Sequence, residues 1–266
     1  VELQKLEKDE GETKLIDMDA TAKLNLLPLL WKADKDCPFT LDTQLTFADH
    51  QTGNNKSWFR PSTSTIAINS GREGEASREY NNTSQYILEW LANFGARFRR
   101  NNIKLMLGYS YQYTKYSTLF AENKDFPNDA LEYNNLGSGA FAKDEGEVGM
   151  SSYKGDNKLI SFFGRVSYDY DGKYLMTASL RREGSSKFGP NNKWGNFPAV
   201  SVGWRISQEP FMAGARSWLN DLKIRADYGV TGNQEFDDYL SVAAMKGFGY
   251  YNFGGKSFQV WGPANN

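Results

Sequence analysis

The 266-residue chain is poor in the residues that build disulfide frameworks and metal sites, because it contains one cysteine and one histidine. Cys37 has no second cysteine in the chain to pair with, and a zinc site made of Cys and His needs several such ligands. His50 lies in a polar segment without a nucleophile motif nearby, so a surface position is the simpler interpretation. These absences exclude a disulfide scaffold and argue against zinc or histidine-dependent chemistry.

The chain also lacks an excess of charge of one sign and a long apolar run. Lys and Arg number 31 against 32 Asp and Glu, so no global field would attract nucleic acid. The longest apolar cluster, residues 24–31, is interrupted by Asn25 and Pro28 and is far shorter than the ~20 residues of a membrane helix. The mean hydropathy of −0.63 does not exclude membrane strands, because every second residue of such a strand faces a polar interior.

What the chain does contain is alternation of period two. In residues 174–181 and 200–207, even positions are apolar and odd positions, apart from Leu175, are small, polar or charged, as in a strand with two unlike faces. Comparable runs occupy residues 16–26, 39–47, 80–98, 103–113, 160–170 and 222–230. Several exceed the 5–6 residues of an average soluble strand and reach the 9–11 of a barrel span. The pattern alone fits either a half-buried soluble sheet or the wall of a transmembrane barrel.

Short and long connections alternate between these runs. Asn101-Asn102 is predicted to be a tight turn. Because both flanking strands place even residues on the apolar face, the loop after Tyr170 needs an odd length, and a type I turn with Gly172 left-handed and a bulge before Lys173 supplies it. The long polar connections are predicted at residues 51–78, 116–157 and 183–197. Outer-membrane barrels have such short periplasmic turns and longer outside loops.

The remaining connections are predicted from composition. Residues 28–38 are expected to link the first two strands, and a short helical turn is expected around residues 211–219. Residues 247–262 are rich in glycine and aromatic side chains and are predicted to form a loop.

Three segments carry a family resemblance. In order, they read RREGSSKFG from Arg181, WGNFPAVSVGWRIS from Trp194 and LKIRADYGVTGNQ from Leu222. They resemble recurring strand and loop signatures of the SusC/RagA family of TonB-dependent outer-membrane transporters. The resemblance is clear over residues 157–266 and rests on pattern before that. The family usually carries Asp where this chain has Glu183, which lengthens the arm of any turn bond made there.

The resemblance implies an all-β fold, an antiparallel transmembrane β-barrel of the large plugged outer-membrane type, with roughly 22 strands. Residues 1–266 would contribute nine or ten strands, a partial barrel wall. Open strand edges are forbidden in lipid, so an internal segment of a longer protein is expected, with the plug domain, the TonB box and the final strands outside it.

The resemblance also implies a function, which is TonB-dependent import of oligosaccharides or peptides across the bacterial outer membrane. The implied partners are a SusD-like surface lipoprotein, the TonB complex through the N-terminal part of the protein, and outer-membrane lipid. No enzymatic reaction, cofactor or nucleic acid is implied.

Family-motif positions are expected to play structural roles at the rim and lumen of the barrel. They are Arg181, Glu183, Gly184, Ser185, Ser186, Phe188, Gly189, Trp194, Gly195, Phe197, Pro198, Trp204, Arg225, Tyr228, Gly229, Thr231, Gly232 and Asn233. Aromatic residues of the loops could stack on a sugar or contact a lid, although packing within the loops is the preferred interpretation. They are Trp58, Tyr116, Phe120, Phe126, Tyr133 and Trp194.

The alternative to a barrel is a soluble or cell-surface β-sandwich that binds carbohydrate. In that architecture a second layer would cover the apolar faces, and Val202, Ile224 and Tyr228 would lie inside a compact globule. The sequence does not identify the ligand under either interpretation.

Overall fold

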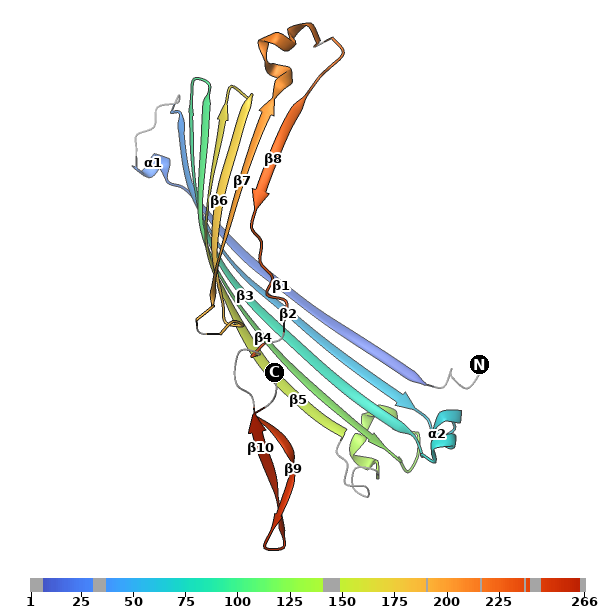
Figure 1. The fold of residues 1–266 in the computed structure, drawn as a ribbon. Coiled ribbons are helices and arrows are strands. Elements are labelled where there is room, and N and C mark those ends of the chain that lie inside the picture. The colour runs from blue at the N-terminus through green and yellow to red at the C-terminus, as the bar shows by residue number, and fades with distance from the viewer. Residues whose placement is uncertain are drawn as a thin grey trace. The chain divides into compact units, whose positions relative to one another are not determined.

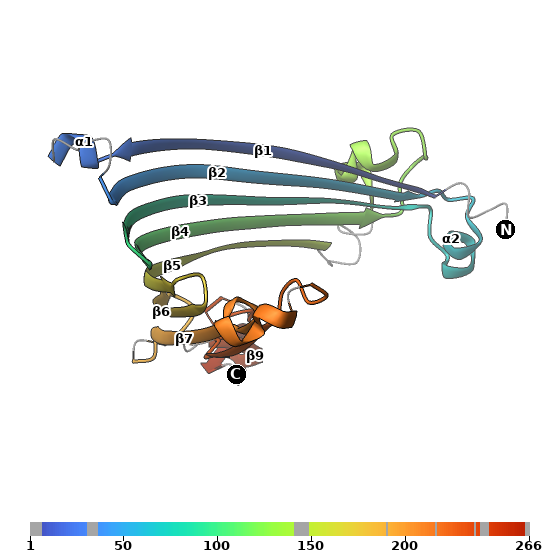
Figure 2. The ribbon, with the colours of Figure 1, turned by 90° about the horizontal axis from the view of Figure 1, so that it is seen from above.

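The structure is a computed structural model that describes residues 7–30, 37–140, 149–189, 191–215, 217–236, 238–239 and 245–263. Among these residues, eight strands form one sheet in sequence order, from β1 to β8, and two more form a separate hairpin (Figures 1 and 2). The strands are β1 Lys8–Asn25, β2 Phe39–Arg60, β3 Glu75–Phe98, β4 Asn101–Lys124, β5 Gly149–Tyr170, β6 Tyr174–Ser185, β7 Trp194–Arg205, β8 Lys223–Gly229, β9 Met245–Phe253 and β10 Lys256–Pro263.

Helical segments are short and lie in the connections. They are α1 Leu27–Leu30, α2 Thr65–Ser70 and the 3₁₀ turns η2 Glu132–Asn134, η3 Leu136–Ser138, η4 Ile206–Gln208 and η5 Pro210–Ala215. The predicted helical turn near residue 211 corresponds to η5. In the described ranges, none of the helices has the length and apolarity needed to cross a membrane.

The contacts divide the chain into two compact units. The first unit comprises Val1–Ala20, Phe47–Ile87 and Tyr113–Asp156, and the second comprises Thr21–Thr46, Leu88–Gln112 and Asn157–Asn266. Strands β6 to β10 lie in the second unit, whereas β1 to β5 contribute residues to both.

In the second unit, the register of β5 to β8 places like residues in transverse rows. One row joins Val166, Ala178, Val200 and Tyr228, and the next joins Tyr168, Met176, Val202 and Ala226. Directly opposite residues of antiparallel strands point to the same side of the sheet. The predicted even-numbered face is therefore confirmed across all four strands, and we call it the apolar face.

The odd-numbered side carries the complementary rows. Ser167, Thr177, Ser201 and Asp227 form one of them, and Arg165, Ser179, Ala199 and Gly229 form another. We call this side the polar face.

The two short turns depart in detail from prediction. Tyr170 pairs with Tyr174, so three residues separate the strands and the predicted parity is correct. However, both Asp171 and Gly172 have positive φ, 57° and 68°, and the Lys173 N–H donates to the Tyr170 carbonyl. Two left-handed central residues are typical of a type I′ turn, not type I. The other turn is formed by Arg99-Arg100, so Asn101-Asn102 already belongs to β4.

Several strands extend further than alternation predicted. Residues 51–60 belong to β2, β3 begins at Glu75, β4 continues to Lys124 and β5 begins at Gly149. The predicted loop at residues 247–262 is instead the β9–β10 hairpin, in which Phe258 pairs with Tyr251. Within the predicted connection 28–38, residues 31–36 lie outside the described residues.

The first unit has a small core at the ends of its strands. Phe59, Ala76 and Phe126 are buried, and Tyr133 and Leu136 pack against them. Two carboxylates fix the connection between β4 and β5: Asp129 accepts hydrogen bonds from the Ser62 N–H and hydroxyl, and Asp125 pairs with Arg72 at 2.9 Å. This polar segment is therefore folded against its neighbours over its described part.

Candidate functional site

The apolar face of the second unit is exposed, although its side chains are large and apolar. Met176, Val202 and Ile224 are 50%, 48% and 59% exposed. Their polar-face neighbours Ser201 and Gly203 are half-buried. A soluble sheet buries its apolar side and exposes its polar side, so this arrangement is inverted. An apolar surface of this extent marks a protein or membrane contact.

Aromatic side chains gather at both ends of the apolar face. At the end with the short turns, Tyr170 and Tyr174 lie with ring centroids 6.2 Å apart. At the other end, Phe162 lies 6.3 Å from Trp194 and 5.2 Å from Tyr109. The rows between these two ends carry mainly aliphatic side chains, such as Val166, Ala178 and Val200. Two aromatic girdles around an aliphatic band are typical of outer-membrane barrels.

A buried carboxylate joins the segment after β7 to the aromatic residues at the turn end. Glu209 is 7% exposed and accepts a hydrogen bond from the Trp204 indole N–H at 3.0 Å. Lys173 lies 3.6 Å from its other oxygen. Hydrogen bonds from Tyr174 and Trp204 hold the pKa of Glu209 below its ordinary value, and Lys173 lowers it further.

The three segments that carry the resemblance meet at one pocket of about 140 Å³. Its lining includes predicted family-motif positions from each segment, namely Glu183, Ser185, Phe188, Trp194, Gly195, Phe197, Gly232 and Asn233. The Phe197 ring fills the space beside Gly232, where an added Cβ would lie 2.5 Å from a ring carbon. The pocket is thus built by close packing of aromatic rings against backbone.

Arg181 and Glu183 form a connected polar group on the polar face. The Arg181 guanidinium donates to Glu183 Oε1 at 2.8 Å and to the Ser161 hydroxyl at 2.9 Å. The Ser161 hydroxyl donates to the same Glu183 oxygen at 2.8 Å, and Ser161 is fully buried. The longer arm of Glu183 reaches across to β5 by this route. Ser161 carries no sequence signal that would have identified it.

The other predicted motif positions are distributed along the strands. Arg225 pairs with Asp227 at 2.8 Å on the polar face, whereas Tyr228 on the apolar face is 74% exposed. Ser186 exchanges hydrogen bonds with the Lys158 backbone. The rest lie on or beside β6, β7 and β8: Gly184 is buried, Gly189 is half-buried, and Pro198, Gly229 and Thr231 are exposed.

The predicted loop aromatics other than Trp194 lie in the first unit and do not form one cluster. Phe126 is 4% exposed in the core, which favours packing over ligand contact. The Tyr133 hydroxyl donates to Glu10 at 2.6 Å, and this bond raises the pKa of Tyr133. Arg60 lies over the Trp58 ring, Tyr116 lies 5.6 Å from Tyr153, and Phe120 is half-buried.

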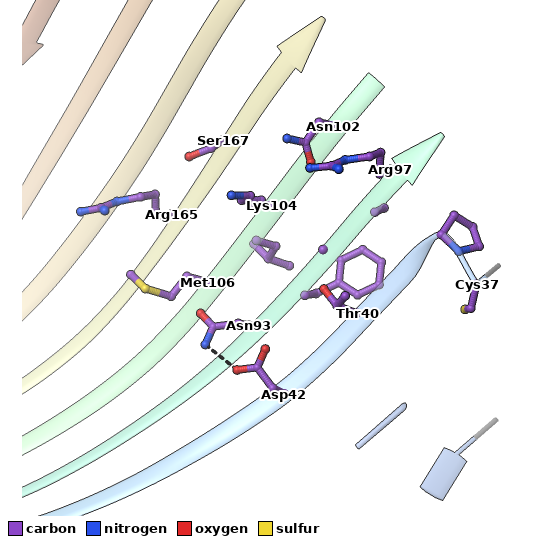
Figure 3. A pocket seen from close by; sticks show the side chains of 15 residues that line it. Cys37, Thr40, Asp42, Asn93, Arg97, Asn102, Lys104, Met106, Arg165 and Ser167 are labelled. Carbon is purple, nitrogen blue, oxygen red and sulfur yellow. Dashed lines mark hydrogen bonds between the residues drawn. The ribbon is translucent and has the colours of Figure 1, made fainter. Parts of the chain in front are cut away.

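Sequence reasoning missed a large hollow on the polar face of the second unit. Its volume is about 800 Å³, and side chains from β2, β3, β4 and β5 line it (Figure 3). Arg97, Lys104 and Arg165 are among them. The alternation of each strand could have placed these three residues on the polar face, because each occupies a position opposite in parity to the apolar positions of its strand.

In the described residues, no group of three or more His, Cys, Asp or Glu side chains could hold a metal ion.

The curated proteins that this chain resembles are all TonB-dependent receptors. No family model matches the chain. TonB-dependent receptor P3 of Formosa agariphila is 36% identical over 185 residues, which cover 70% of this chain and 18% of the relative. TonB-dependent receptor P39 of the same organism is 35% identical over 195 residues, 71% of this chain and 18% of the relative. TonB-dependent receptor SusC of Bacteroides thetaiotaomicron is 36% identical over 118 residues, 43% of this chain and 12% of the relative. The chain thus spans a fifth or less of the curated relatives it matches.

Solved structures show the same fold. The RagAB peptide transporter matches with a TM-score of 0.77 at 21% identity, covering 99% of this chain and 27% of that one. The RagAB peptide importer in its open-open state matches with a TM-score of 0.76 at 20% identity. The predicted fold, an antiparallel transmembrane β-barrel of which this chain forms part of the wall, is confirmed. Together with the curated relatives, this places the chain in the SusC/RagA family of TonB-dependent outer-membrane transporters.

Proposed function

We propose that the full-length protein imports oligosaccharides or peptides across the bacterial outer membrane, driven through TonB. The observation that carries this proposal is the exposed apolar face of β5 to β8 behind a polar face. Lipid covers such a face without a second protein layer, and the polar face then borders an aqueous lumen. The rival β-sandwich requires Val202, Ile224 and Tyr228 to be interior, yet they are 48%, 59% and 74% exposed.

We infer that residues 1–266 are part of the barrel wall and that other parts of the full-length protein supply the plug domain, the TonB box and the remaining strands. The small share of the relatives that this chain spans supports the inference. In this role the chain provides wall, lumen and outside loops, while the coupling to TonB acts elsewhere.

A SusD-like surface lipoprotein is the proposed partner at the outside loops, on the basis of the family resemblance. The proposed role requires no covalent chemistry and no enzymatic residue. The solved RagAB neighbours are a peptide transporter and a peptide importer. At 20–21% identity they favour neither ligand class for this chain.

The test uses the full-length protein in its native outer membrane. We expect salt and alkaline washes to leave it in the membrane fraction and detergent to release it, because lipid covers the apolar face. Uptake of labelled oligosaccharides and peptides should depend on the transporter gene and disappear when tonB is deleted. Release by alkaline wash would contradict the membrane assignment, and uptake that persists without TonB would contradict the coupling.

A further inference from the structure

The hollow on the polar face combines size with polar donors. Its volume of about 800 Å³ lies in the range of ligand sites, about 300–1,000 Å³. Thr40, Asn102 and Ser167 provide hydroxyl and amide groups, and Met106 provides apolar surface. Figure 3 shows Arg97, Lys104 and Arg165 on three neighbouring strands, and all three belong to the lining of the hollow. The hollow can therefore accommodate a solute of several residues or sugar units.

Three cations and one carboxylate line this hollow, which gives a formal balance of +2. The carboxylate, Asp42, is already engaged, because Asn93 donates a hydrogen bond to it at 2.9 Å. For Arg97, Lys104 and Arg165, the described part of the chain contains no ion pair or side-chain hydrogen bond. All three side chains are solvent-exposed.

Other cations near the polar face contrast with this group. Arg181 pairs with Glu183 at 2.8 Å and Arg225 with Asp227 at 2.8 Å. Arg205 lies 3.4 Å from Asp221. Within the described residues, these arginines have carboxylate partners, whereas the three cations in the hollow have none. Clustered like charges without partners create a positive potential that attracts anions.

We propose that the hollow binds carboxylate groups of the transported solute, so that the protein imports polyanionic oligosaccharides or acidic peptides. Arginine suits this role because its planar guanidinium binds a carboxylate through two parallel hydrogen bonds. Lys104 adds a third charge from the strand between the two arginines. The inference rests on the proposed import function and specifies the chemistry of the solute.

The test measures binding to the full-length protein in detergent by calorimetry, with four probes. Tetragalacturonate and tetraglutamate carry carboxylates, and maltotetraose and tetraglutamine are their neutral counterparts. We expect at least one acidic probe to bind and its neutral counterpart to bind at least tenfold more weakly. Raising NaCl from 50 to 500 mM should lower the affinity for the acidic probe severalfold, because salt screens exposed charges.

Variants locate the binding. We expect a threefold loss of affinity for the acidic probe, or about that, from each of the single variants Arg97→Gln, Lys104→Gln and Arg165→Gln, since an exposed ion pair contributes at most about 1 kcal/mol. The triple variant should lose at least about 20-fold, and Arg97→Lys should lose less than Arg97→Gln, because it keeps the charge but not the two parallel hydrogen bonds. Lys115→Gln is the matched control, because Lys115 lies on β4 like Lys104 but at a position of opposite parity; it should leave binding unchanged.

The outcomes separate this inference from the proposed function. Equal binding of acidic and neutral probes, or an unchanged triple variant, overturns the inference while TonB-dependent uptake still stands. If neither acidic probe binds and the triple variant lowers the thermal midpoint of the full-length protein, the three cations pair with a carboxylate of the protein itself, and the inference is again wrong. If the full-length protein supported no TonB-dependent uptake, the proposed import function itself would be wrong.

Discussion

At the scale of single residues, aromatic rings on the polar face lie across glycine. An added Cβ on Gly108 of β4 would lie 2.2 Å from a ring carbon of Phe163 on β5. The Arg181 guanidinium lies over the Phe163 ring, 5.5 Å from its centroid. Because Gly108 has no side chain, the Phe163 ring of β5 can lie across β4.

We expect Gly108→Ala to lower the free energy of unfolding by about 1–3 kcal/mol, because an overpacked site forces the ring to move. Gly53→Ala is the control: Gly53 lies in β2 with nothing within 4 Å of an added Cβ, and the change should stay within about 0.5 kcal/mol. Heat-dependent gel mobility of the full-length protein measures both. A neutral Gly108→Ala would mean that the Phe163 ring is free to leave.

Lipid contact on the apolar face gives a second residue-scale prediction. Val202→Arg places a charge on the lipid side of β7 and should cost about 2–4 kcal/mol if the site lies near the bilayer midplane. Ser201→Arg, one residue away on the polar face and opposite Asp227, should be tolerated. Membrane-inserted yield and thermal midpoint are the measurements. Equal tolerance at the two positions would contradict a lipid-facing apolar side.

Parity was predictable from the sequence because it is a local property of a strand. The alternation of β6 and β7 identified which residues share a face, and the register confirmed it. Partners that come from distant strands were not predictable in this way. Ser161 and the Arg97, Lys104 and Arg165 group become visible only when neighbouring strands are aligned.

At the scale of elements, strand centres were predicted better than strand ends. Alternation stops where both faces become polar, so residues 75–79 of β3 and 149–156 of β5 gave no strand signal although they pair in the sheet. The predicted turn between β3 and β4 lies two residues after the observed one. Asn101-Asn102 has the favoured turn residues, but Arg99 adopts the positive φ of 52°.

The segment after β7, which contains Glu209, leads to a prediction about how stability depends on pH. Because the pKa of Glu209 is lowered in the folded protein, its carboxylate contributes stability that is complete above the ordinary value of about 4.5 and is lost as pH falls through the folded value. We expect the thermal midpoint to fall as pH drops below about 4.5, and Glu209→Gln to make this dependence less steep. The comparison needs melting curves of both proteins between pH 3 and 7. Parallel curves would show that Glu209 does not contribute.

At the scale of the whole molecule, the sheet order ends in β1 and β8. Among the described residues, each terminal strand has one hydrogen-bonded neighbour in this sheet, so one side of its backbone has no strand partner there. Unpaired backbone groups are costly in hydrocarbon, which is why membrane sheets close into barrels. The family resemblance predicted this arrangement, whereas composition and periodicity alone did not distinguish it from a sandwich.

Residues 1–266 expressed alone should therefore fail to insert as a stable species. We expect the segment to aggregate or to remain accessible to protease in detergent and liposomes, whereas the full-length protein should be protected and should shift in mobility on heating. Gel mobility and protease protection are the measurements. A protected, heat-modifiable segment would mean that β1 and β8 find partners within the segment or between copies.

The length of β3 and β4 has a further consequence. Each contains 24 residues, which extend about 80 Å at 3.3 Å per residue. Even at a tilt of 45° such a strand rises about 55 Å, nearly twice the ~30 Å of hydrocarbon in a bilayer. Close to half of each strand must then have water on both sides, in agreement with the polar residues Asn82, Ser84 and Ser117. A solute approaching from outside would meet this hydrated stretch of wall well before it reached the depth of the lipid.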